Sequence, residues 1–211
     1  MIELYTWGTP NGRKAPIMLE EVGLPYAVHP VNLGREEQYD PAFLKISPNN
    51  KIPAIVDPDG PGGRISVFES GAILIYLAEK AGKLLAPSGP QRYKALEWLN
   101  WQIGGVGPMF GQLGFFAIRS EQKSELAIKR FTDECERLLG VMDRRLDESE
   151  YLAGPEFTIA DIACYPWVLA GTAFLAPALG PIFNECPSVQ RWLATVGARE
   201  AVKRGMAVPK M

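Results

Sequence analysis

Histidine and cysteine are scarce in this chain of 211 residues. The one histidine is His29, and the three cysteines stand at positions 135, 164 and 186. A single imidazole argues against a His-rich metal site and against Ser-His-Asp or Cys-His catalysis. An odd number of widely spaced cysteines, with no Cys-x-x-Cys pair, argues against a disulfide framework or a zinc ribbon. The sequence therefore predicts no metal site and a reducing, cytoplasmic location.

An excess of charge of one sign is also missing. The chain has 22 Lys and Arg against 24 Asp and Glu, a net charge of −2, so no basic surface indicates nucleic acid or anionic lipid as a partner. Residues 1–7 lack the basic segment and apolar run of a signal peptide. Residues 162–183 carry no charge, but three prolines and two glycines interrupt them. That pattern favours packed helices over a membrane span.

The composition otherwise suits a folded protein, with 47% apolar and 22% charged residues. Strand and helix periods alternate over the first 84 residues. Strands are predicted at residues 2–6, 26–31, 54–56 and 65–68, and helices at 14–22, 40–46 and 70–82. A loop over residues 57–64 is expected to join the last two strands. The order is βαβ followed by ββα, which predicts an α/β domain with parallel pairing first and an antiparallel hairpin after it.

Residues 85–90 contain two prolines, a glycine and a serine, which predicts a linker between a domain at 1–84 and a second domain at 91–211. Beyond the linker the apolar residues follow helical spacing only, so the second domain is expected to be all-helical. The run Gly104-Gly105-Val106-Gly107-Pro108 should kink its first long helix. Thr158 and Asp161 have the spacing of a capping box that opens a buried helix.

Three of these local features occur together in one known family. Lys51-Ile52-Pro53-Ala54 resembles its cis-proline loop, Phe68-Glu69-Ser70-Gly71-Ala72-Ile73 its γ-glutamyl site, and 158–161 its capping box. Nearly the whole chain resembles a cytosolic glutathione transferase, with a thioredoxin-like first domain and an all-helical second domain. Thr9-Pro10-Asn11-Gly12-x-Lys14, residues 47–53 and residues 104–111 resemble the Nu class, described as glutathione-dependent disulfide-bond oxidoreductases.

The resemblance implies a binding site for glutathione, used as a cosubstrate. Ser70 at a helix N-terminus would bind the γ-glutamyl carboxylate, and Glu69 would pair with the ammonium. The alternative is that Ser70 is a plain N-cap and Glu69 an acidic residue of the first turn. A cis peptide before Pro53 would turn the N–H and C=O of Ile52 toward the tripeptide backbone, as an added strand would.

Thr9 and Asn11 lie where the family places the group that faces the thiol. Residues 9–12 contain neither Cys nor Ser, so the attacking sulfur should come from glutathione. The Thr9 hydroxyl, the Asn11 amide and the positive end of the following helix could together lower the pKa of the thiol. The alternative is a plain turn before the helix. Tyr5 is the competing activator, and strand alternation favours a core position for it.

The remaining candidates are implied by the resemblance alone. Gln38 and Arg130 resemble further glutathione ligands, with Arg130 on a glycyl carboxylate, a second glutathione or a site across a dimer. A solvated surface arginine is the alternative. Lys51 could assist a carboxylate or be a surface lysine. His29 is expected at a strand edge.

The cysteines are expected to be structural. Cys135 and Cys164 continue apolar patterns and are predicted to be core, and Cys186 beside Pro187 could be exposed, although nothing nearby marks it as an activated thiol.

The leading functional prediction is a homodimeric, glutathione-dependent disulfide reductase acting on a small-molecule disulfide. One alternative is a transferase or peroxidase acting on electrophiles or hydroperoxides. The other is a non-enzymatic glutathione-binding protein, since a fold does not fix a function.

Overall fold

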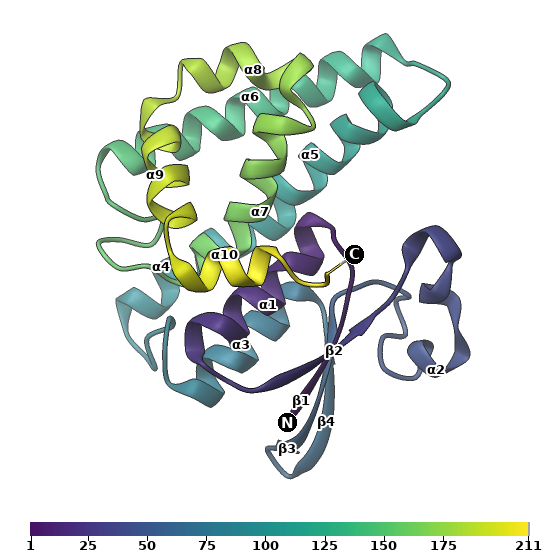
Figure 1. Cartoon of the computed structure of the whole chain (residues 1–211). Helices are drawn as coiled ribbons and strands as arrows, with labels where there is room; N and C mark the ends of the chain where they lie inside the picture. Colours follow the sequence, from purple (N-terminus) through teal and green to yellow (C-terminus); the bar gives the residue numbers. More distant parts are fainter. Residues whose placement is uncertain (211) are drawn as a thin grey trace. The chain divides into compact units, whose positions relative to one another are not determined.

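The computed structural model describes residues 1–210, which divide into two compact units (Figure 1). The first unit combines Met1–Pro87 with the segment that begins at Ala198, and the second unit is Ser88–Gly197. The first is an α/β unit of the thioredoxin-like kind, and the second is helical. This is the predicted pair of fold classes.

The first unit is built on a four-stranded sheet in the order β2-β1-β3-β4. The strands are β1 (Ile2–Thr6), β2 (Tyr26–Pro30), β3 (Ala54–Gly60) and β4 (Gly63–Phe68). β1 is parallel to β2 and antiparallel to β3, and β3 is antiparallel to β4. The predicted βαβ–ββα order is therefore confirmed.

The hairpin between β3 and β4 is tighter than predicted. Instead of a loop over 57–64, both strands continue until Gly60 pairs with Gly63, leaving Pro61 and Gly62 as the turn. Gly62 has φ 79°, a conformation that suits glycine after a proline in a tight turn. Pro61 and Gly62 therefore form a tight turn between two long strands.

Four α-helices belong to the first unit. They are α1 (Pro10–Val22), α2 (Pro41–Leu44), α3 (Ser70–Ala81) and α10 (Glu200–Met206). α1 begins at Pro10, four residues before the predicted start. Proline is well suited to the first position of a helix because its φ is already helical and its missing N–H is not needed there. Residues 10–12, which precede the predicted helix, therefore belong to the first turn of α1.

The main core of this unit lies between the sheet and the helices α1 and α3. Leu4 and Ile55 of the sheet, Ile17 of α1, and Ile73 and Leu77 of α3 are all fully buried. Because side chains alternate along a strand, the opposite face of the sheet carries a second, smaller cluster. Its members come from β1, β3, the loops and α2: Tyr5, Val31, Phe43, Ile46, Ile52 and Ala54.

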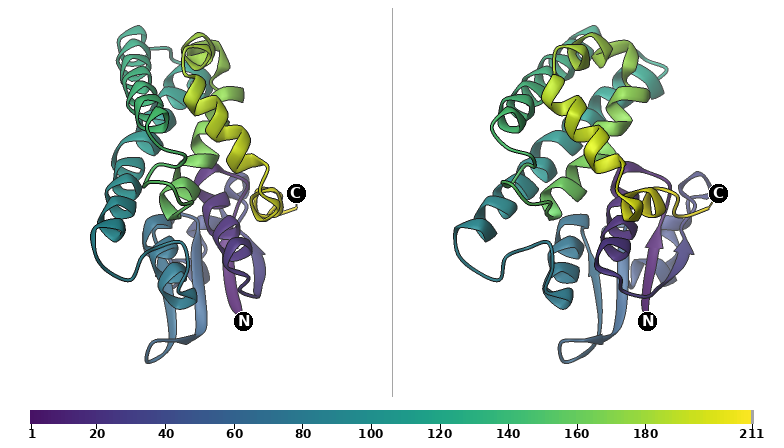
Figure 2. Two further views of the ribbon diagram at one scale, coloured as in Figure 1. Left: turned by 90° about the vertical axis from the view of Figure 1, so that its left-hand side faces the viewer. Right: turned by 60° about the vertical axis from the view of Figure 1, so that its left-hand side comes forward.

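α10 packs on α1, although the sequence placed all of residues 91–211 in the helical domain. Figure 2 shows this helix, in yellow, beside α1. A Cβ atom on Gly205 would lie 2.5 Å from the Ile17 Cα atom, so the two backbones touch. Arg199 forms two hydrogen bonds to Glu21, at 2.7 and 2.8 Å, and Arg204 Nε lies 2.6 Å from Glu20 Oε2. These contacts attach the segment to the first unit.

The second unit contains long helices interrupted by π-helical turns. They are α4 (Pro90–Trp101), α5 (Gly107–Gly114), α6 (Glu125–Asp147), α7 (Ile159–Ala173), α8 (Ala176–Asn184) and α9 (Pro187–Gly197). Gln102–Val106 is π-helical and joins α4 to α5, and Phe115–Arg119 is π-helical after α5. The glycine-rich run that was predicted to kink a helix therefore lies largely in a π-helical turn, which is wider than an α-helical turn.

The uncharged stretch at 162–183 forms two helices. α7 and α8 are bent by 107° relative to each other, and within residues 1–210 no single helix is long and apolar enough to cross a membrane. Ile162, Ala163 and Cys164 are fully buried.

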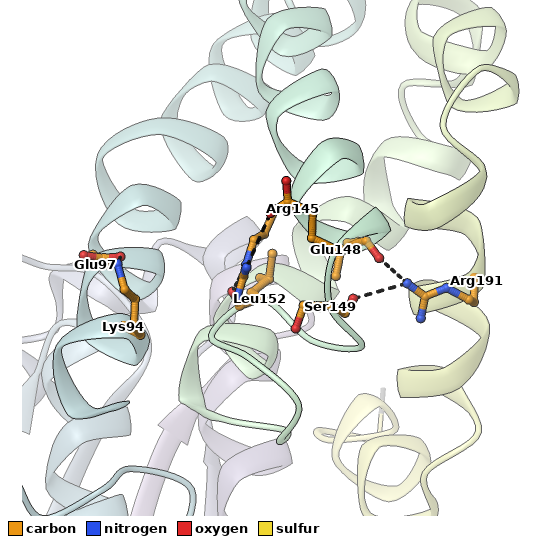
Figure 3. A network of polar contacts seen from close by, with 8 residues as sticks. Lys94, Glu97, Arg145, Glu148, Ser149, Leu152 and Arg191 are labelled. Atoms are coloured by element: carbon orange, nitrogen blue, oxygen red, sulfur yellow. Dashed lines mark hydrogen bonds and ion pairs between the residues drawn. The ribbon is translucent and has the colours of Figure 1, made fainter. Parts of the chain in front are cut away.

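A buried polar network joins the C-terminal end of α6 to α7 and α9. The predicted capping box is confirmed, with Asp161 accepting from Thr158 N at 3.0 Å. Asp161 also accepts from Leu152 N and from Trp192 Nε1. Figure 3 shows the adjoining contacts, in which Arg145 Nε donates to Leu152 O at 2.8 Å. Arg191 donates to Leu146 O in the last turn of α6 and to Ser149 O just beyond the helix. The helix end thus has partners for carbonyls that a helix cannot satisfy internally.

Candidate active site

The predicted site residues of the first unit leave the sheet at one end. His29, Tyr5, Ala54 and Phe68 are successive cross-strand partners from β2 to β4. In the sequence, Val31 follows His29, Thr9 follows Tyr5 and Glu69 follows Phe68. Pro53 directly precedes Ala54. Loops that leave neighbouring strands at the same end come close together, so the register itself assembles these segments.

Thr9 is the N-cap of α1. Its Oγ1 accepts a hydrogen bond from Gly12 N at 3.1 Å, and its backbone is extended. Because a hydroxyl has one hydrogen and two lone pairs, accepting this bond leaves the Thr9 O–H able to donate to another group. Asn11 is the second residue of the helix and half-buried. The arrangement offers a hydroxyl donor and an amide at the positive end of α1.

The loop before β3 carries the predicted cis peptide. The Ile52–Pro53 bond is cis, which confirms that expectation. Ser47 is fully buried, and its Oγ donates to Lys51 O at 2.8 Å. This bond fixes the loop from inside while the Lys51 side chain remains exposed. Ile52 packs against the smaller core cluster, so its backbone position is set by packing.

The start of α3 differs from the alternative in which Ser70 is a plain N-cap. Ser70 is the first helical residue, and Glu69 occupies the N-cap position without a side-chain capping bond. Glu69 has φ 69°, a rare conformation for a residue with a side chain. Asn49 Nδ2 lies 3.4 Å from Glu69 Oε1. Neither the Ser70 hydroxyl nor the Glu69 carboxylate is used to cap the helix, so both are available for another partner.

Lys14 joins α1 to α3, a role that sequence reasoning missed. Its side chain is 1% exposed, and Nζ lies 3.2 Å from Ser70 Oγ. The motif that begins at Thr9 includes Lys14, but the sequence assigned no role to this residue. A charged residue among buried apolar neighbours gives no signal in a hydrophobic pattern, so only the structure reveals its position.

Gln38 and Arg130 lie in different units. Gln38 belongs to the short helical turn Glu37–Tyr39, and its Oε1 is a buried acceptor with no hydrogen-bond partner among the described residues. A buried acceptor of this kind is suited to a ligand donor. Arg130 is exposed on α6 of the second unit.

Tyr5 is a core residue, as predicted. Its ring stacks on His29 at 4.7 Å between centroids, and its hydroxyl donates to Glu3 Oε2 at 3.4 Å. Burial and the neighbouring Glu3 carboxylate raise the pKa of Tyr5. The hydroxyl therefore points back along β1, away from the end where Thr9 begins α1. His29 is exposed on the edge strand β2, also as predicted.

The three cysteines lie in the second unit and form no disulfide among the described residues. Cys135 and Cys164 are fully buried, as predicted, and Cys186, whose exposure the sequence left open, is also buried, at 5% exposed. Burial raises the pKa of Cys135 to about 12 and also raises the pKa of Cys186. Thiols with raised pKa values are poor nucleophiles at neutral pH. The described residues also contain no group of three His, Cys, Asp or Glu side chains that could hold a metal ion.

Two family models match the chain. The one described as "Glutathione S-transferase, N-terminal domain" matches residues 9–80, and the one described as "Glutathione S-transferase, C-terminal domain" matches residues 106–200. The first range contains all of the proposed glutathione ligands of the first unit, from Thr9 to Ser70, and the second contains Arg130.

Known proteins resemble the chain over almost its whole length. Disulfide-bond oxidoreductase YfcG of Escherichia coli is 51% identical over 98% of this chain and 94% of its own. A glutathione transferase family member from Pseudomonas fluorescens, solved with two glutathione bound, is 48% identical with a TM-score of 0.94, covering 99% of this chain and 93% of its own. A glutathione transferase from Pseudomonas putida, with one glutathione disulfide bound per subunit, is 47% identical with a TM-score of 0.94, over 99% and 91%.

Proposed function

The chain belongs to the glutathione S-transferase family, and from that premise we propose that it is a glutathione-dependent disulfide-bond oxidoreductase. One observation carries the proposal: the segments of Thr9, the cis-Pro53 loop and Ser70 leave the sheet at the same end, in a unit whose sequence contains no cysteine. Such a site can hold a thiol peptide but has no thiol of its own. The reacting sulfur must therefore enter with the ligand.

Each candidate residue matches one part of glutathione. The Ser70 hydroxyl and the N-terminus of α3 suit the γ-glutamyl carboxylate, and Glu69 suits the neighbouring ammonium. The backbone of Ile52, turned by the cis bond before Pro53, suits the cysteinyl peptide group. Lys51 and Gln38 are assigned to the remaining polar groups of the tripeptide.

Thr9 and Asn11 are assigned to the sulfur. A free thiol with a pKa of about 8.5 is only a few per cent ionised at pH 7. Lowering that pKa by about two units requires roughly 2.7 kcal/mol of preference for the thiolate. A hydroxyl donor, an amide donor and the positive end of α1 together have this magnitude, because a hydrogen bond to a charged group contributes about 1.5–3 kcal/mol and a helix end up to about 1 kcal/mol.

The proposed chemistry is two successive thiol–disulfide exchanges. The glutathione thiolate attacks one sulfur of the substrate disulfide, a new S–S bond forms, and the departing thiolate takes up a proton. A second glutathione attacks the mixed disulfide and releases the second substrate thiol with oxidised glutathione. Two glutathione molecules are oxidised as one disulfide is reduced, so no metal or redox cofactor enters the balance.

The relatives support this chemistry. YfcG is named a disulfide-bond oxidoreductase, and the two Pseudomonas proteins were solved with two glutathione or with glutathione disulfide. We assign Arg130 to a glycyl carboxylate, on a second glutathione or across a dimer, because an arginine binds a carboxylate through two hydrogen bonds. The dimeric state and the cytoplasmic location belong to the same proposal. So does the division by sequence into domains 1–84 and 91–211 with a linker at 85–90, in which α10 follows the second domain in the chain and packs with the first unit.

The test is a disulfide-exchange assay with purified protein. Hydroxyethyl disulfide and glutathione are the substrates, and oxidised glutathione is measured through glutathione reductase and NADPH. We expect turnover that depends on the protein and on glutathione. Parallel assays with an aryl halide and with a hydroperoxide cover the transferase and peroxidase alternatives. Glutathione binding without turnover in any assay would identify a binding protein, and faster turnover of the halide or peroxide would contradict the proposal.

A further inference from the structure

We propose that Lys14 is a positioning residue for glutathione, which holds the Ser70 hydroxyl so that its hydrogen is directed at the γ-glutamyl carboxylate. The inference rests on the proposed function, because it assigns Lys14 a part in binding that ligand. It concerns affinity for the peptide end of glutathione, whereas Thr9 acts on the sulfur.

The position of Lys14 is the first argument. The side chain comes from α1, is 1% exposed, and brings Nζ to 3.2 Å from Ser70 Oγ at the start of α3. Lysine is among the residues that are least often fully buried, because removing an ammonium group from water is unfavourable by several kcal/mol. A charge kept in such a place, in contact with a ligand-binding residue, indicates a function for the charge.

The direction of the hydrogen bond is the second argument. An ammonium group has three donors and no acceptor, so Ser70 Oγ must accept in this contact. The single hydrogen of the hydroxyl is then left to donate to a different acceptor. A carboxylate accepts only. Lys14 therefore selects the orientation of Ser70 in which its hydroxyl can bind an anionic group.

The electrostatic field at Ser70 is the third argument. The ammonium of Lys14 and the positive end of α3 have the same sign and lie at the same residue. Both favour an anion over a water molecule at the half-buried Ser70 hydroxyl. The γ-glutamyl carboxylate is the anionic group that the proposed function brings to this position.

The experiment is a double-mutant cycle on glutathione binding. Isothermal titration calorimetry gives the Kd of wild type, Lys14→Met, Ser70→Ala and the double variant. We expect Lys14→Met to weaken binding about 10-fold or more, as for a charge-assisted contact. In the Ser70→Ala background the same change should weaken binding by only about 3-fold or less, because the two residues act as one unit.

Kinetics and a matched control separate positioning from a structural role. Lys14→Met should raise KM for glutathione by the factor seen in Kd and change kcat by less than about 3-fold, since uniform binding is what it removes. Lys80→Met is the control, because Lys80 is another lysine of this unit with a polar partner, Asp57, and lies near the opposite end of α3. Its Kd should stay within about twofold of wild type.

The outcomes distinguish this inference from the proposed function. A wild-type protein that binds no glutathione defeats the proposed function itself. A wild type that binds, beside a Lys14→Met variant of equal affinity, overturns the role of Lys14 alone. Equal effects of Lys14→Met with and without Ser70 also overturn it. If Lys14→Met does not fold, Lys14→Gln tests the charge alone, because it keeps an N–H donor for Ser70. We then expect glutathione binding to weaken about 3- to 10-fold, and an unchanged Kd overturns the inference.

Discussion

Thr9 has a structural role and a proposed chemical role at the same oxygen atom. Its Oγ1 accepts from Gly12 N as the cap of α1, and its hydroxyl hydrogen is assigned to the glutathione sulfur. Tyr5 lies on the preceding strand, but its hydroxyl donates to Glu3 and its ring packs in the smaller core cluster. At the scale of single residues, the two candidate activators therefore have different environments and different expected effects.

We predict that Thr9→Ala loses far more disulfide reductase activity than Tyr5→Phe. Loss of a bond of about 1.5–3 kcal/mol to a thiolate lowers kcat about 10- to 150-fold if the bond is fully formed in the transition state. Because alanine also removes the cap, at about 1 kcal/mol of stability, Thr9→Ser is the matched control and should retain activity. An unaffected Thr9→Ala beside an inactive Tyr5→Phe would reverse the assignment.

The cysteines should be dispensable for catalysis. All three are buried in the second unit, and the pKa of Cys135 and that of Cys186 are raised. Replacing the three by alanine should leave kcat within about threefold of wild type in protein that remains folded, since buried thiols are inert. Circular dichroism checks the fold. Lost turnover with intact glutathione binding would instead indicate a thiol of the protein in the mechanism.

At the scale of elements, regular patterns were predictable and tertiary contacts were not. The strand at 2–6 and the helix at 70–82 follow from apolar spacing, and both were found within one residue of the expected limits. The early start of α1 depends on Thr9 as its cap, and the short hairpin turn depends on the pairing of Gly60 with Gly63. Contacts between residues distant in the sequence leave no local signal.

The same limit applies to the candidate site. Short sequence motifs that resemble those of the family identified Ser70, Glu69 and the cis-Pro53 loop, because such motifs are local in the sequence. Lys14 was missed because its burial results from the packing of α1 near α3. The exposure of Cys186 could not be decided from its neighbouring proline, because tertiary packing covers the thiol.

Asp57 should make the first unit sensitive to acid. Burial raises the pKa of Asp57, but hydrogen bonds from Lys80, Tyr76 and the Asp59 N–H outweigh it, so the pKa lies below its usual range. A carboxyl with a lowered folded pKa stabilises above its unfolded pKa, about 3.9, and this stability is lost as the pH falls through the folded pKa. Urea unfolding between pH 7 and 2 measures it.

Asp57→Asn provides the comparison. It should lower the free energy of unfolding at pH 7 by about 1–3 kcal/mol, because it removes a charged acceptor from Lys80 and Tyr76. It should also flatten the acid limb of the stability curve. Asp59→Asn is the control, since Asp59 contributes its backbone N–H and its side chain is exposed. An acid limb that is the same in Asp57→Asn and wild type would contradict this account.

Gly205 should be intolerant of any side chain. A Cβ atom there meets the Ile17 backbone at 2.5 Å, and backbone atoms cannot move aside as a flexible side chain can. Gly205→Ala should lower the free energy of unfolding by about 1–3 kcal/mol, as for an overpacked core. Gly180→Ala is the control, because open space surrounds that helical glycine. It should be neutral or stabilising by up to about 1 kcal/mol, and equal losses in both variants would exclude a role for the α1 contact.

At the scale of the whole molecule, we predict a homodimer. Two-fold dimers are the commonest protein assemblies, and Arg130 could then serve a glutathione held by a partner subunit. Sedimentation equilibrium at micromolar concentration should give twice the 23.2 kDa of one chain. If Arg130 acts across the interface, Arg130→Ala should weaken glutathione binding in the dimer. A mass of one chain in the presence of glutathione would exclude the dimer.

The attachment of α10 to α1 also has a consequence for biosynthesis. The first unit, to which we assign the glutathione site, is assembled from Met1–Pro87 and a segment that begins at Ala198, with the whole second unit between them in the sequence. At about 5–20 residues per second, a ribosome needs roughly 5–20 s to make the intervening segment. During that interval the nascent first unit exposes the face of α1 that later contacts Gly205. A chaperone that recognises nascent apolar surface would find it there, and translation must pass residue 205 before the unit is closed.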